Sequence, residues 1–162
     1  VEFGEYLDRI APFKEDAVCF MTNSGTESVE AAIKLARYHT KRPQFIGFFG
    51  GFHGRTMGAV TFTASKPGYH RGFFPLMSGV NHVPFPDPYR PILNSRPGED
   101  YGETVVRYIE EEIMVRIAPA DEIAGILVEP IQGEGRYIIP PTGFFPASRC
   151  LCDNHGIWLI AS

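Results

Sequence analysis

Short, nearly continuous apolar runs alternate along this chain with longer segments of helical periodicity, and this alternation restricts the possible folds more than any other feature. The apolar runs cover residues 17–22, 45–49, 82–85, 123–129 and 157–161. Strands buried on both faces have this pattern, and helices are the usual connections between parallel strands. The sequence therefore predicts an α/β fold with a mainly parallel sheet and helices on both of its faces.

The segments between the apolar runs have the spacing of amphipathic helices. A helix is expected from Ser24 to about Thr40, with one apolar stripe made of Val29, Ala32, Ile33 and Ala36. A second helix is expected over 103–117, with one face made of Val106, Ile109, Ile113 and Ile117. The remaining helices are expected at 1–11, which Pro12 would end, and at 56–63 and 143–155.

Charge and composition exclude several classes of function. The net charge is −4, whereas a surface that binds nucleic acid usually needs a basic excess, so we expect no nucleic-acid partner. No apolar run approaches the roughly 20 residues of a membrane-spanning helix, so we expect no membrane partner. The three cysteines have neither a disulfide framework nor zinc-site spacing, and this favours reduced thiols in a cytoplasmic protein without a metal.

No linker or internal repeat divides the 162 residues, so they are expected to form a single unit. Val1 begins inside an expected helix and Ser162 directly follows an apolar run, whereas complete domains usually end in a polar tail. These two ends predict a fragment of a larger protein. Between Gly68 and Gly102 the chain makes a long excursion rich in proline, glycine and aromatic residues, and such loops are often functional.

Polar, glycine-containing segments follow the expected strands, at the edge where parallel sheets bind ligands. In the first, TNSGTE, Ser24 and Glu27 have the spacing of a capping box, and helix capping is a sufficient structural explanation for both. Gly25, however, lies in the first helical turn, where glycine costs about 1 kcal/mol relative to alanine. A helix N-terminus with bare backbone attracts anions, so a bound phosphate is the functional interpretation.

Two further glycine-rich segments contain candidate site residues. GGFHGRT surrounds Phe52 with glycines, so that its ring can stack on a planar ligand; a core Phe52 beside a surface His53 is the structural alternative. EPIQGEG begins with Glu129 at the end of an expected buried strand, where the carboxylate must be paired or hydrogen-bonded. A capped turn with surface acids explains Glu134 better than it explains Glu129.

Together, the segments NSGTESVEAAIKLAR, GGFHGRT and VEPIQGEG resemble the class III, pyridoxal-phosphate-dependent aminotransferases over nearly the whole chain. HVPFPDPYRP resembles the 4-aminobutyrate and acetylornithine aminotransferase branch, and GIWLIA resembles the segment before the family's D-E-V-Q motif. The resemblance implies that residues 1–162 are part of the pyridoxal-phosphate-binding large domain of a type I transferase. The N-terminal segment, the lysine-bearing half and the small C-terminal domain would be missing.

The resemblance also implies roles for the candidate residues. The loop of Ser24, Gly25 and Thr26 would bind the cofactor phosphate, mainly through the backbone N–H groups of Gly25 and Thr26. Phe52 would stack on one face of the pyridine ring, and His53 would lie beside it.

The same resemblance assigns the two glutamates. Glu129 would join the hydrogen-bond network behind the ring, and Glu134 resembles a glutamate that pairs with a distant arginine in ω-amino acid enzymes. Two positions depart from the family pattern: Ser162 stands where an aspartate is expected, and Arg136 replaces the usual second glycine of GEGG. The Schiff-base lysine is expected beyond Ser162, so no catalytic residue is assigned within this chain.

By this resemblance the parent protein is an enzyme, a cytoplasmic homodimer that transfers an amino group from an amino acid to a 2-oxo acid with pyridoxal 5'-phosphate. An ω-amino acid or an ornithine-like donor is expected, and the fragment alone is expected to be inactive. Two alternatives stay open. A racemase or aminomutase of the same fold would share all three motifs, and a non-catalytic phosphoanion-binding domain would need only Gly25 and Thr26.

Overall fold

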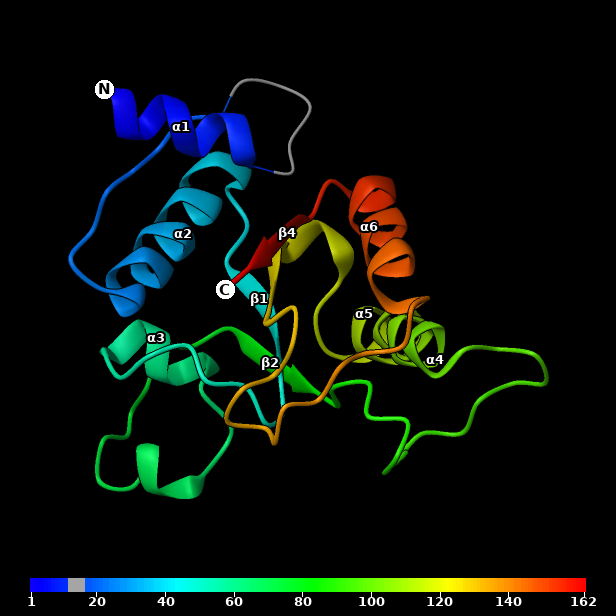
Figure 1. Ribbon diagram of the computed structural model, residues 1–162. Helices are drawn as coiled ribbons and strands as arrows, with labels where there is room; N and C mark the ends of the chain where they lie inside the picture. The colour runs from blue at the N-terminus through cyan, green and yellow to red at the C-terminus, as the bar shows by residue number, and fades with distance from the viewer. Residues whose placement is uncertain (12–16) are drawn as a thin grey trace.

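A four-stranded sheet lies at the centre of the computed structural model, which describes residues 1–11 and 17–162 (Figure 1). The strand order is β2-β1-β3-β4, and every neighbouring pair is parallel. The predicted α/β fold with a parallel sheet is confirmed. The strands are β1 (Gln44–Phe48), β2 (Val80–Val83), β3 (Ile123–Val128) and β4 (Trp158–Ala161).

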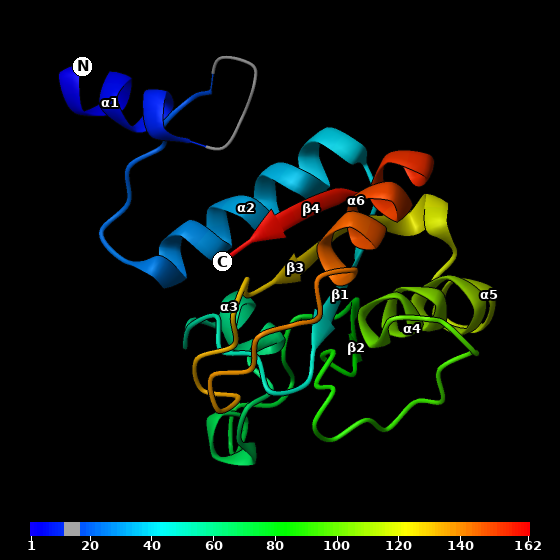
Figure 2. The same cartoon turned by 45° about the vertical axis from the view of Figure 1, so that its right-hand side comes forward.

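Helices cover both faces of this sheet, as predicted (Figures 1 and 2). Helices α2 and α3 pack on one face, and α4 and α6 pack on the other. The first helix, α1, has no buried residue and projects away from the sheet. The helices are α1 (Glu2–Ile10), α2 (Gly25–Thr40), α3 (Met57–Phe62), α4 (Tyr101–Tyr108), α5 (Met114–Arg116) and α6 (Phe144–His155).

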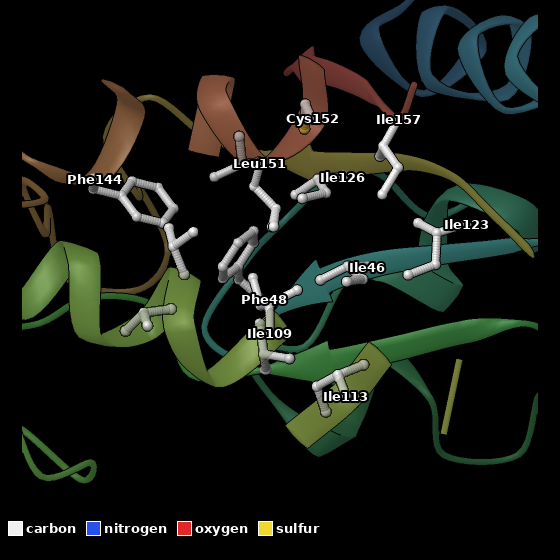
Figure 3. Close-up of a cluster of buried hydrophobic side chains, with 14 of the residues drawn as sticks. Ile46, Phe48, Ile109, Ile113, Ile123, Ile126, Phe144, Leu151, Cys152 and Ile157 are labelled. Carbon is white, nitrogen blue, oxygen red and sulfur yellow. The ribbon is translucent and has the colours of Figure 1, made fainter. Parts of the chain in front are cut away.

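Each face of the sheet has its own apolar cluster, because successive strand residues point to opposite sides of a sheet. The larger cluster lies on the α4–α6 face. Ile46 and Phe48 of β1 point into this cluster, whereas Phe45 points to the α2–α3 face. Phe144 at the start of α6 is fully buried there and meets Phe48 edge to face, with ring centroids 5.7 Å apart (Figure 3).

The prediction of a buried strand at 17–22 is wrong. Among the described residues this segment pairs with no strand, and it runs outside the sheet toward the start of α2 (Figure 2). Val18 is 97% exposed and Phe20 is 76% exposed. A short apolar run becomes a strand only beside another strand edge, because its backbone hydrogen bonds must be made by a neighbour. Pro12, which was expected to end the preceding helix, lies outside the described residues.

The expected helix at 103–117 forms, but it is not regular throughout. It begins after Asp100, whose carboxylate accepts a hydrogen bond from the Gly102 N–H (2.7 Å) in a capping box with Glu103. A π-helical segment over Ile109–Ile113 then joins α4 to α5. The helix ends at Arg116, and Ile117 directly after it is 59% exposed rather than buried as predicted, because its backbone has left the helical conformation. Within the described residues, no helix is long and apolar enough to cross a membrane.

Candidate functional site

The N-terminus of α2 and the loop after β1 form two walls of one cavity, which has a volume of about 640 Å³. We call it the site cavity. It lies at the carboxyl end of the sheet, where the sequence predicted a ligand site, and Ser162 after β4 completes its lining. The lining residues are Ser24, Gly25, Thr26, Phe52, His53, Gly54, Arg55, Thr56 and Ser162.

The predicted capping box of Ser24 and Glu27 does not form. The Ser24 side chain caps no N–H of α2, and the Glu27 carboxylate accepts a hydrogen bond from the Asn23 N–H at 2.7 Å instead of from Ser24. The Ser24 backbone is extended, with φ −156°, and the Thr22 hydroxyl donates to its carbonyl. The N–H groups of the first turn of α2 therefore have no side-chain cap within the described residues, and they border the site cavity.

Gly25 has free space on the side where other residues have a side chain. A Cβ atom built at this position meets no atom of the described part of the chain within 4 Å. The surrounding protein therefore does not require glycine here, and the absent side chain leaves room next to the free N–H groups. Such bare backbone allows an anion to come close to a helix N-terminus.

Phe52 is held at two points. Its N–H donates to Glu129 Oε1 at 2.8 Å, and its ring lies 5.2 Å from the ring of Tyr69 at an angle of 59°. The other carboxylate oxygen of Glu129 accepts from the Gly133 N–H at 2.8 Å. The expected hydrogen bonding of Glu129 is thus supplied by two backbone amides, and its carboxylate joins the loops that follow β1 and β3.

His53 is buried, with 4% of its surface exposed, so the alternative of a surface histidine is wrong. Its ring meets Phe62 edge to face, with centroids 6.3 Å apart, and neither ring nitrogen has a hydrogen-bond partner among the described residues. Burial, together with the nearby His82, lowers the pKa of His53 to about 4. The imidazole is therefore neutral at neutral pH and forms an uncharged wall beside Phe52.

Glu134 lies at the surface and forms an ion pair. Its carboxylate is 2.9 Å from Lys66 Nζ and accepts a longer hydrogen bond, 3.3 Å, from the Tyr69 hydroxyl. The hydrogen bond from Lys66 lowers the pKa of Glu134. Arg136 has φ 86°, in the region that favours glycine, which is the residue that the family pattern has at this position.

Two residues near the cavity, Glu30 and Thr56, were missed by the sequence analysis. Glu30 of α2 accepts hydrogen bonds from the start of α3, and the Thr56 hydroxyl lies 2.8 Å from the hydroxyl of Thr26. Glu30 follows Thr26 by four residues, so helical spacing indicated that the two share a face. Nothing in the sequence indicated that α3 would pack against that face.

Comparison with known proteins shows the family of this chain. The family model for Aminotransferase class-III matches residues 1–162. The chain belongs to this family. The class-III chain is 45% identical over 159 residues to an acetylornithine aminotransferase of Methanopyrus kandleri. The match covers 98% of this chain and 34% of that protein. It is 34% identical over 163 residues to an alanine/serine racemase of Pyrococcus horikoshii, covering 99% of this chain and 34% of the racemase.

A solved structure has the same fold as this class-III chain. It is an amine transaminase from an uncultivated Pseudomonas species in its PLP-bound form, with a TM-score of 0.76 and 32% identity. The match covers 86% of this chain and 32% of that one. The class-III chain described here therefore spans about a third of the length of the relatives it matches.

Proposed function

We propose that the protein containing this chain is a pyridoxal-phosphate-dependent aminotransferase, and that residues 1–162 form part of its cofactor-binding large domain. It transfers an amino group from an amino acid to a 2-oxo acid, and an ω-amino acid or an ornithine-like donor is the expected class. When bound, the cofactor supplies an electron sink that neither the backbone nor the side chains of this chain can provide. Family membership and the PLP-bound structural neighbour support this function.

One observation supports the proposal above all others: uncapped helix N–H groups and an aromatic ring line the same cavity. Helix α2 has 16 residues, so its N-terminus has the partial positive charge that favours a phosphate. Gly25 leaves open space beside these N–H groups. The residues present therefore fit a ligand that combines a phosphate with a flat ring.

Each candidate residue then has a physical task. Gly25 and Thr26 bind the phosphate through their N–H groups, and Ser24 shapes the turn before them. Phe52 stacks on the ring, and its main-chain bond to Glu129 keeps it in place. Buried, neutral His53 excludes water from one side of the cavity.

Glu134 is proposed as a substrate-binding residue. Its ion pair with Lys66 is solvent-exposed and therefore weak, since the Lys66 side chain is 63% exposed. A cationic group of a substrate, or an arginine from elsewhere in the parent protein, can replace Lys66 at low cost. We further propose that the parent protein is a cytoplasmic homodimer.

A racemase is the second candidate function, because one relative 34% identical to this chain is an alanine/serine racemase. The two activities differ in their products. The complete protein is incubated with pyridoxal phosphate, a single enantiomer of an amino acid, and a 2-oxo acid. An aminotransferase consumes the 2-oxo acid and forms a new amino acid from it. A racemase forms the opposite enantiomer of the supplied amino acid and leaves the 2-oxo acid unchanged.

The replacement Phe52→Ala tests the ring-stacking part of the proposal in the complete protein. Loss of the stacking contact, which is worth about 0.5–1.5 kcal/mol, should weaken pyridoxal phosphate binding by up to about tenfold in a spectroscopic titration. Tyr38→Ala is the matched control, because Tyr38 is a 75% exposed aromatic residue at the far end of α2. Unchanged affinity in Phe52→Ala would contradict stacking and favour a domain that recognises only the phosphate.

A further inference from the structure

Glu30 joins the two walls of the site cavity. In a helix, side chains lean toward the N-terminus, so Glu30 reaches back along α2 to the level of Thr26. There one oxygen, Oε1, accepts hydrogen bonds from the Gly58 N–H (2.8 Å), the Ala59 N–H (3.1 Å) and the Thr56 hydroxyl. This carboxylate therefore caps the first turn of α3, which Thr56 itself does not cap with its side chain.

The carboxylate also determines the direction of a short hydrogen-bond chain. Oε1 of Glu30 is an acceptor, so the Thr56 hydroxyl donates its proton to it. The Thr26 hydroxyl lies 2.8 Å from the Thr56 hydroxyl and must then be the donor in that contact. The proton of Thr26 therefore points toward Thr56, and among the groups of Thr26 the backbone N–H is the donor left for an anion in the cavity.

Two glycines allow this junction to be so close. A Cβ atom at Gly54 would lie 2.2 Å from Thr26 Oγ1, and a Cβ atom at Gly58 would lie 2.3 Å from Glu30 Oε2. Gly54 also has φ +128°, which side chains rarely tolerate. The two walls are thus in direct contact through Thr26, Thr56 and Glu30, and a side chain at either glycine would separate them.

We propose that Glu30 is a positioning residue for the phosphate of the cofactor. Acting through Thr56, it keeps Thr26 and the N-terminus of α2 at a fixed distance from the loop that contains Phe52. The N–H groups of Gly58 and Ala59 donate to the carboxylate of Glu30 and stabilise its negative charge at this position. This inference rests on the proposed function, because it assumes that a phosphate group occupies the cavity.

The test compares two ligands in the complete protein: pyridoxal phosphate, and pyridoxal, which lacks the phosphate. Glu30→Ala removes the acceptor for Thr56, Gly58 and Ala59. We expect it to lower the affinity for pyridoxal phosphate about tenfold and the affinity for pyridoxal less than about twofold. The reason is that only the phosphate would contact the N-terminus of α2. Glu30→Gln keeps an acceptor oxygen at the same place and should stay within about threefold of the wild type for both ligands.

Thr56→Val is the second variant, because it breaks the hydroxyl chain but leaves the Glu30 cap on Gly58 and Ala59 in place. We expect about a threefold loss that is specific to pyridoxal phosphate. Glu103→Ala is the matched control, since Glu103 belongs to the capping box at the start of α4, which does not line the site cavity. It should leave the ratio of the two affinities unchanged.

The outcomes separate the two proposals. A wild-type protein that binds pyridoxal phosphate no more tightly than pyridoxal contradicts the proposed function, and the inference fails with it. A wild type that prefers pyridoxal phosphate, with the same ratio in Glu30→Ala or in Thr56→Val, contradicts the positioning role alone. A fall in the ratio for Glu103→Ala would also overturn it, because general loosening would then explain the effect.

Discussion

The two faces of the sheet differ in what holds their helices in place. On the α4–α6 face, large apolar side chains such as Phe48, Phe85 and Phe144 meet edge to face. On the α2–α3 face, a smaller apolar cluster is supplemented by polar contacts, in which Glu30 and Thr56 join the two helices. The site cavity borders the second face.

Because of this difference, one face mainly stabilises the fold and the other mainly positions the residues of the site cavity. Apolar contacts are non-directional and scale with buried area, so they stabilise a fold without defining the place of a particular atom. Hydrogen bonds contribute less net free energy but define distance and direction. We therefore expect substitutions on the α4–α6 face to lower stability most, and substitutions around α2 and α3 to change ligand binding most.

The largest effect is expected for Phe144→Ala on the apolar face. Phe144 is fully buried, and truncating such a residue leaves a cavity, so the free energy of unfolding should fall by about 3–5 kcal/mol. Chemical denaturation of the complete protein measures this change. Ile139→Ala, at a side chain that is 68% exposed, should change it by less than about 0.5 kcal/mol. A loss below about 1 kcal/mol for Phe144→Ala would remove the contrast between the faces.

An effect of intermediate size is expected in the pH dependence of the free energy of unfolding, because of His53. The unfolded chain binds a proton at its ordinary pKa of 6.5, whereas buried His53 binds one only near pH 4. The contribution of His53 to the free energy of unfolding is therefore fully present above pH 6.5. It falls as the pH drops toward 4 and changes no further below that, with about 3 kcal/mol lost in total.

Denaturation at several pH values, with His53→Gln for comparison, isolates this contribution. The variant should lose less stability than the wild type between pH 6.5 and pH 4. Burial also lowers the pKa of His82, and that part of the pH dependence should remain in the variant. Identical pH profiles for both proteins would show that His53 is not buried in neutral form.

The smallest effect is expected for Gly25→Ala, and here stability and binding should change in opposite directions. Alanine favours a helix by up to about 1 kcal/mol over glycine, and a Cβ atom at this position has no atom of the described residues within 4 Å, so the variant should be slightly more stable. The same methyl group occupies space beside the N–H groups and should weaken pyridoxal phosphate binding several-fold. Denaturation and a ligand titration measure the two changes. Stabilisation without weaker binding would mean that the phosphate lies elsewhere.

The strands and main helices could be predicted because each follows from a local pattern. The apolar runs at 45–49 and 123–129 became β1 and β3, and the stripe over Val29, Ile33 and Ala36 is buried against the sheet. The run at 17–22 has the same local pattern, but within residues 1–11 and 17–162 no strand pairs with it. A strand depends on a partner distant in the sequence, so composition alone could not separate these cases.

The residues of the candidate site also fall into two groups, those that a local sequence pattern identifies and those that it does not. Gly25 and Phe52 were identified because glycine in a helix and glycines around an aromatic residue are unusual within their own segments. Glu30 gave no such indication, because a glutamate in the middle of an amphipathic helix is ordinary. Its role arises from contact with residues that lie 26–29 positions away in the sequence.

The amino-acid sequence by itself determined the fold class, the positions of the main elements and the family, because periodicity and motifs are encoded over a few residues at a time. Only the tertiary structure decided that Ser24 does not cap α2, that His53 is buried and neutral, and that Glu30 connects the walls of the cavity. These properties depend on which surfaces meet, and the direction of a hydrogen bond or the desolvation of a ring exists only after they have met.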